Sequence, residues 1–356
     1  MKVFHNIYIA VLCLILSLGI FTFSFYYYLL SAPSKDSSVS SFEVKPGSVS
    51  SIATSLKEND YIRSDLAFKI YIKLTGKSNL KAGVYELSRD MGVKDIVNLL
   101  EKGSSINKDE ISILFKEGLN ISKIGAVIEE NTNNSKEDFY RVLEDKEYLN
   151  SLISKYWFLS NEVLNDKIYY SLEGYLYPST YNFSSKDVKS ETIIETMLNE
   201  MEKQLKDYKD DIEESDKSFH EILTMASIVE LEGVTKEDRV GIAGVFYNRI
   251  KSGMNLGSDV TTYYGAKINM GDRDLYSSEL SECNNYNTRC ATFKRLPISP
   301  ICSPSMDSII ASLNPDTNNY YYFVADKNKK VYFSKNITEH NNTIYRLKKE
   351  GLWYEY

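Results

Sequence analysis

The pattern of apolar and polar residues divides the chain into one long apolar stretch and many short amphipathic ones. Residues 7–30 carry no charge, and an apolar stretch of this length can span a bilayer as a helix. It is longer than the apolar region of a cleavable signal peptide, although "SAPS" at 31–34 leaves cleavage as the alternative. We therefore predict a single-pass anchor at 7–30, with a short cytoplasmic tail at 1–6 and the bulk of the chain outside the cytoplasm.

The remaining pattern predicts an α+β fold in two parts. A Ser-rich linker at 31–42 leads into a small unit at 43–104, with strands near 43 and at 81–87 and helices that end before Gly103. The larger part, 105–356, begins with a strand at 110–115, continues with mostly helical segments and ends near a hairpin at 319–335. Polar, turn-rich stretches at 254–267, 284–290 and 296–305 read as loops, and long loops beside rigid helices often carry binding and catalytic groups.

The helix expected at 219–232 carries the most informative carboxylate of the sequence. Its apolar residues recur at helical spacing, and at about 100° per residue Glu230 falls inside the apolar stripe that begins at Phe219. Glu232 falls on the opposite side and is expected to be solvated. A buried carboxylate is costly unless it is protonated or paired. Glu230 is therefore either a functional acid or the partner of a nearby arginine.

Composition excludes several classes of function. A net charge of −7 offers no electrostatic basis for nucleic-acid binding, and three scattered histidines support neither a zinc site nor a Ser-His-Asp mechanism. We expect no metal and no cofactor. Three cysteines lie outside the apolar stretch, so at most one disulfide forms within the chain, and proximity favours Cys283 with Cys290 over any pair with Cys302.

Several stretches, in order, resemble the endolytic murein transglycosylases of the YceG-like type. They are "KAGVYEL", "EGYLYPSTYNF", "ASIVELEG", "VFYNRIKSGMNL", "SDVTTYYG", "YNT", "LNP", "YYYFVAD" and "TEHN". The resemblance implies a membrane-anchored enzyme with a LysM-like module at 43–104 and a catalytic domain at 105–356. The implied partners are peptidoglycan glycan strands, the cytoplasmic membrane and, as candidates, peptidoglycan synthases.

The resemblance also implies roles for individual residues. The family's catalytic Glu matches Glu230, which would protonate the β-1,4 glycosidic oxygen and then accept the C6-hydroxyl proton as 1,6-anhydromuramic acid forms. One carboxylate suffices because the nucleophile belongs to the substrate. Further family positions are expected either to line the sugar cleft or to serve structure alone: Asp259, Tyr286, Asn287 and Thr288. Glu173 is expected to hold its own loop.

Departures from the family pattern keep two alternatives open. Gly257 and Val260 replace the usual Gln and Pro, while Ser179 and Lys116 replace an Asp and a Pro. Three loop glycines have become Arg295, Ser299 and Ser305, so this loop could follow a different path. The first alternative is a muramidase-type hydrolase with Glu230 as acid and Asp259 as base. The second is a catalytically weak scaffold that binds glycan.

Overall fold

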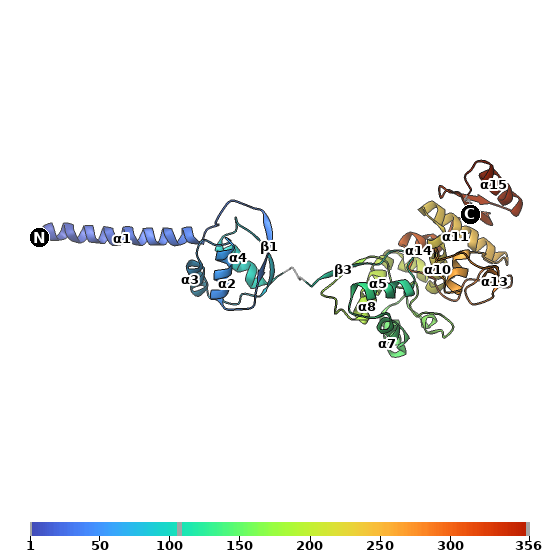
Figure 1. The fold of residues 1–356 in the computed structure, drawn as a ribbon, viewed down its shortest axis with the longest axis horizontal. Coiled ribbons are helices and arrows are strands. Elements are labelled where there is room, and N and C mark those ends of the chain that lie inside the picture. The colour runs from blue at the N-terminus through green and yellow to red at the C-terminus, as the bar shows by residue number, and fades with distance from the viewer. Residues whose placement is uncertain (1, 105–108, 354–356) are drawn as a thin grey trace. The chain divides into compact units, whose positions relative to one another are not determined.

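The computed structural model describes residues 2–104 and 109–353, which form two compact units, 1–110 and 111–356 (Figure 1). The first unit begins with helix α1 (Lys2–Leu30). Within it, Ile7–Leu30 has a mean hydropathy of 2.4 and no charged residue, so its length and composition suffice to cross a membrane.

The globular part of the first unit is a two-stranded antiparallel sheet covered by three helices. Its elements are β1 (Val39–Val44), α2 (Val49–Glu58), α3 (Asp65–Thr75), β2 (Gly83–Ser88) and α4 (Val93–Lys102). In the sheet, Phe42 pairs with Tyr85 across the strands, and both side chains are buried with the apolar faces of the helices. The predicted order of strands and helices is present. Strand β1 starts at Val39, inside the stretch predicted as a linker, because its Ser residues pair with β2.

The N-terminal part of the second unit packs helices around a short antiparallel sheet. Its elements are β3 (Ile111–Leu114), α5 (Ile121–Asn131), α6 (Lys136–Glu144), α7 (Lys146–Lys155), the 3-10 turn η1 (Asn161–Leu164), β4 (Thr180–Phe183), α8 (Ser190–Leu205), η2 (Lys206–Tyr208) and α9 (Lys209–Glu213). Strand β4 brings aromatic side chains into the interior. Its Tyr181 and Phe183 join the buried core, so these aromatic side chains serve packing.

The C-terminal part of the second unit is built on a central helix. Its elements are α10 (Phe219–Glu232), α11 (Lys236–Lys251), α12 (Asp259–Gly265), α13 (Ser277–Ser281), α14 (Met306–Leu313), β5 (Tyr322–Ala325), β6 (Val331–Ser334) and α15 (Ile337–Lys349). Helices α10, α11 and α14 lie side by side (Figure 1). The expectation of a loop at 254–267 was wrong in part, since 259–265 forms α12.

Helix α10 owes its all-round apolar sequence to its central position. Ile222, Leu223 and Ala226 join the N-terminal core, while Met225 and Ile228 join a second core with α11 and α12. Apart from Glu221, which belongs to the capping box that begins the helix at Ser218, all residues from 219 to 229 are buried. The helix is thereby fixed on all sides up to the turn that carries Glu230.

Candidate active site

Glu230 lies at the end of the buried part of α10, among four hydrogen-bond donors. Its Oε1 accepts a bond from Arg239 Nη2 at 3.0 Å. Its Oε2 accepts bonds from the Ser305 amide at 2.9 Å, from Ser305 Oγ at 2.5 Å and from Ser308 Oγ at 2.7 Å. Only 6% of the Glu230 side chain is exposed. The sequence left open a protonated acid or a paired carboxylate, and the structure has the paired form.

The donors reach Glu230 because residues 298–305 run alongside α10. His220 Nε2 bonds the Ile298 carbonyl at 2.9 Å, and the Ile301 amide donates to Ser227 Oγ at 3.0 Å. At the end of this run, Ser305 is the N-cap of α14. This loop, 298–305, is therefore held along the length of the helix before it delivers its donors to the carboxylate.

Gly174 packs against the other side of the same loop, and its neighbour Glu173 is buried beside it. Both carboxylate oxygens of Glu173 accept a bond from the Ile121 amide, at 3.0 and 3.2 Å, and Tyr264 Oη donates at 2.8 Å. Glu173 is 1% exposed, and burial raises its pKa to about 8. Gly174 has φ +83°, and a Cβ there would lie 2.4 Å from Pro300 Cβ. Glu173 thus holds its loop, as predicted.

Glu232 corrects the sequence prediction, because it is not solvated. It accepts a bond from Ser258 Oγ at 2.6 Å, and burial raises the pKa of its carboxyl above the usual value. The second apolar core packs on the far side of α10, and the periodicity of one helix does not reveal such a covering core. Asp259 influences Glu232 electrostatically and pairs with Arg289, and its side chain is 53% exposed.

Tyr286, Asn287 and Thr288 are fully buried, with their polar atoms engaged inside the protein. The Tyr286 hydroxyl accepts a bond from the Tyr169 amide, and the Asn287 amide donates to the carbonyls of residues 279, 280 and 282. Thr288 Oγ1 accepts a bond from the Ser258 amide. This geometry favours a structural role for the three residues and leaves Asp259 as the exposed member of the predicted group.

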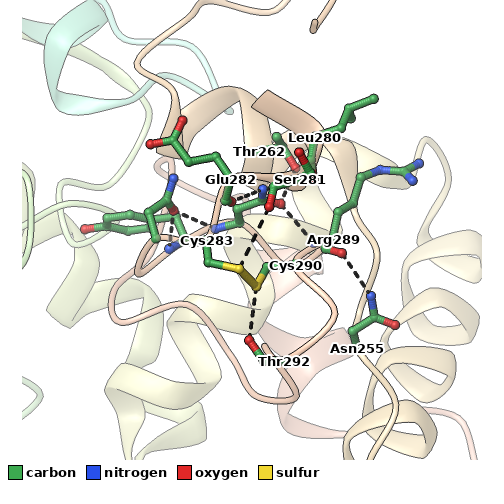
Figure 2. The surroundings of a disulfide bond; sticks show 12 residues. Asn255, Thr262, Leu280, Ser281, Glu282, Cys283, Arg289, Cys290 and Thr292 are labelled. Carbon is green, nitrogen blue, oxygen red and sulfur yellow. Dashed lines mark hydrogen bonds between the residues drawn. A yellow bond between two sulfur atoms is a disulfide. The ribbon is translucent and has the colours of Figure 1, made fainter. Parts of the chain in front are cut away.

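A disulfide between Cys283 and Cys290 closes the loop that contains Asn287, so the predicted pairing is confirmed (Figure 2). The Arg289 carbonyl beside it accepts a bond from Asn255 at 3.4 Å (Figure 2). Cys302 is buried and free, with its thiol directed at the Ser227 carbonyl. The disulfide therefore restrains the loop that carries Arg289, the ion-pair partner of Asp259, and it lies apart from the contacts of Glu230.

Two charged residues beside Glu230 were missed by sequence reasoning. Arg239 lies on α11 with 13% of its side chain exposed. Glu117 has an exposed side chain whose carboxyl is partly desolvated, and this desolvation and, to a smaller extent, the negative charge of Glu230 raise its pKa. A signal for Glu117 was present in the sequence, because it directly follows Lys116, one of the departures from the family pattern. No such signal marked Arg239, because an arginine in a charged helix turn is common.

Comparison with known proteins assigns the chain to a family. The YceG-like family matches residues 42–346. The chain belongs to the YceG-like family. A Bacillus subtilis protein named endolytic murein transglycosylase is 38% identical over 88% of this chain and 86% of its own length. A Streptococcus pneumoniae protein of the same name is 31% identical over 83% of this chain and 56% of its own length.

A solved structure supports the same relationship. The crystal structure of a YceG-like protein from Listeria monocytogenes matches with a TM-score of 0.61 and 34% identity, covering 86% of this chain and 99% of that one. Within this YceG-like chain, the replaced glycines cause no backbone strain. In the described residues, the non-Gly positions with positive φ are elsewhere, at Asp60, Leu172, Lys267 and Lys329. One replacement, Ser305, supplies two of the four donors to Glu230.

Proposed function

We propose that this protein is a membrane-anchored, endolytic peptidoglycan lytic transglycosylase. The observation that carries the proposal is its relationship to proteins named endolytic murein transglycosylase, at 38% identity over 88% of the chain. The uncharged stretch Ile7–Leu30 supports anchoring in the cytoplasmic membrane, with the second unit outside. Its substrate would be nascent glycan strands, and their cleavage would end strand elongation beside peptidoglycan synthases. The unit at 43–104 would serve as a LysM-like module.

Glu230 is the residue best placed for the chemistry. In the proposed reaction, protonated Glu230 gives its proton to the oxygen that links N-acetylmuramic acid to N-acetylglucosamine, and that bond breaks. The C6 hydroxyl of the same muramic acid attacks C1, and its proton passes to the Glu230 carboxylate. The product is a 1,6-anhydromuramic acid end, and Glu230 is protonated again. The anchored donors at Ser305 and Ser308 would keep the carboxyl in one orientation between the two steps.

The hydrolase alternative needs a base on the same side of the helix as Glu230. Asp259 was the predicted base, but it lies with Ser258 and Arg289 near Glu232. Glu230 and Glu232 are two positions apart on α10, so they point about 200° apart around its axis. This placement favours the transglycosylase over a hydrolase that uses Asp259.

Mass spectrometry of the products tests the proposed function. The full chain in detergent micelles is incubated with uncross-linked glycan strands, with Glu230→Gln in parallel. We expect anhydro ends, which are lighter than hydrolytic ends by the mass of one water, and no product from the variant. Reducing ends would identify a hydrolase. Glycan binding without cleavage by either protein would identify a scaffold.

A further inference from the structure

The ion pair between Glu230 and Arg239 poses a problem for an acid. A general acid must carry a proton, yet the Arg239 guanidinium and three further donors surround the Glu230 carboxylate, and a paired cation favours the anionic form of a carboxyl group. When Glu230 takes up a proton, Arg239 loses its anionic partner. Its side chain is only 13% exposed, and a buried cation without a partner is strongly unfavourable. The reaction centre therefore needs a second anion for Arg239.

One nitrogen of the Arg239 side chain has no hydrogen-bond acceptor among the described residues. Its Nη2 bonds Glu230, while its Nε is buried and has no hydrogen-bond partner among the residues that the structure describes. A buried guanidinium nitrogen without an acceptor is unusual, because burying an unpaired donor costs free energy. The position of this nitrogen indicates that an acceptor joins it in another state of the site.

Glu117 is held close to this ion pair by the backbone on both sides of it. The Phe115 amide donates to the Ser179 carbonyl at 2.9 Å, and the Gly118 amide donates to the Ser303 carbonyl at 2.8 Å. A Cβ at Gly118 would lie 3.3 Å from Leu231 Cδ2, so this segment passes directly over the end of α10. The backbone that carries Glu117 is therefore fixed at the end of α10, and its side chain reaches solvent while its carboxyl is near enough to be influenced by the charges of Glu230 and Arg239.

The charged groups around Glu117 favour it as the second anion for Arg239. Burial raises its pKa first, the charge of Glu230 raises it further, and Arg239 acts in the opposite direction. The other carboxylate that acts on Glu117 is Asp307, which pairs with Lys236 at 3.6 Å. Asp307 thus has its own cation, whereas in the described part of the chain Glu117 forms no ion pair that competes with Arg239.

We propose that Glu117 is a positioning residue of the reaction centre that becomes the partner of Arg239 when Glu230 is protonated. In the resting state Glu230 is the ion-pair partner of Arg239. In the reactive state Glu230 holds the proton that it donates, and the ionised Glu117 becomes the partner of the same guanidinium. Arg239 therefore has an anionic partner in both states. This proposal rests on the proposed function, for which Glu230 is the acid.

Steady-state kinetics of the full chain in detergent test whether Glu117 contributes to the reaction. Glu117→Gln removes the charge and keeps the size, so we expect kcat to fall at least about tenfold with little change in KM, within the range for acid–base groups. The pH–rate profile of Glu117→Gln should also lose the fall in rate at low pH that protonation of Glu117 causes. Glu117→Asp, which retains a carboxylate, should recover part of the rate. The control Glu137→Gln, an exposed residue on α6, should stay within about twofold of the wild type.

An NMR titration tests the coupling without relying on activity. The carboxyl carbon of Glu117 is followed in 13C-Glu-labelled full-length protein and assigned by its loss in Glu117→Gln. In Glu230→Gln, one negative charge is gone and Arg239 is free, so we expect the pKa of Glu117 to fall. An unchanged titration would overturn the exchange, as would wild-type kinetics in Glu117→Gln. Absence of anhydro products from the wild type would instead reject the proposed function, and the titration would still decide the coupling.

Discussion

The buried carboxyl of Glu173 predicts that the second unit becomes less stable as the pH rises towards 8. Burial raises its pKa from 4.5 to about 8 in the folded protein, while the unfolded chain keeps the ordinary value. Between these two pH values the folded state holds a proton that the unfolded state has released. The stabilisation is therefore fully present below pH 4.5 and is lost as the pH rises to about 8.

The size of the effect follows from the interval between the two pKa values. At about 1.4 kcal/mol per pKa unit, the interval from 4.5 to about 8 corresponds to about 5 kcal/mol. Between pH 5.5 and pH 7.5, the free energy of unfolding should fall by about 3 kcal/mol on account of Glu173 alone. In Glu173→Gln this slope disappears. The variant should be less stable than the wild type at pH 5.5, since its amide brings two N–H donors, and the protonated carboxyl only one, to a site whose neighbours at Ile121 and Tyr264 also donate.

Urea unfolding of the full chain in detergent measures this slope. The fluorescence of Trp157 follows unfolding, because its indole packs against the same core as the Glu173 loop. The wild type, Glu173→Gln and the exposed control Glu137→Gln are compared at pH 5.5, 6.5 and 7.5. We expect parallel slopes for the wild type and the control, and a flatter slope for Glu173→Gln. Equal slopes in all three proteins would refute the assignment of a retained proton to Glu173.

Three further predictions concern the Cys283–Cys290 disulfide, Gly174 and Asp259. Reduction of the Cys283–Cys290 disulfide, whose sequence separation is 7, should cost about 2–3 kcal/mol by the chain-entropy relation, seen as a lower melting temperature; an unchanged value would show that the bond does not restrain the loop. Gly174→Ala should destabilise the protein by about 1–3 kcal/mol because its Cβ would meet Pro300, and wild-type stability would show that the loop can move away. Asp259→Asn should leave anhydro-end formation within about tenfold of the wild type, and complete inactivity would support Asp259 as a reacting group.

The sequence predicted the parts of the site that depend on local periodicity. Glu230 could be singled out because its angle on a helix follows from its spacing to Phe219. The same reasoning failed for Glu232, since the second core that covers its side of α10 comes from residues up to seventy positions away, such as Ile301. Residues 259–265 look like a loop because they lie in a stretch rich in polar residues and glycine, with Gly257 before them and Gly265 at their end. They form α12 because Thr261 and Thr262 bond with Thr288 and Asn287.

The hydrogen-bond partners of Glu230 could not be predicted from local sequence patterns, because they are distant from it in the sequence. Ser305 contacts Glu230 across seventy-five positions, and its donors are delivered by a loop tied to α10 at His220 and Ser227. The replacement of a family glycine by Ser305 looked like a loss of loop flexibility, yet its hydroxyl adds a donor to the carboxylate. A glycine there would keep the amide donor and lose the hydroxyl. This chain therefore holds Glu230 as an anion more firmly than a glycine would, which makes a second anion for Arg239 all the more necessary.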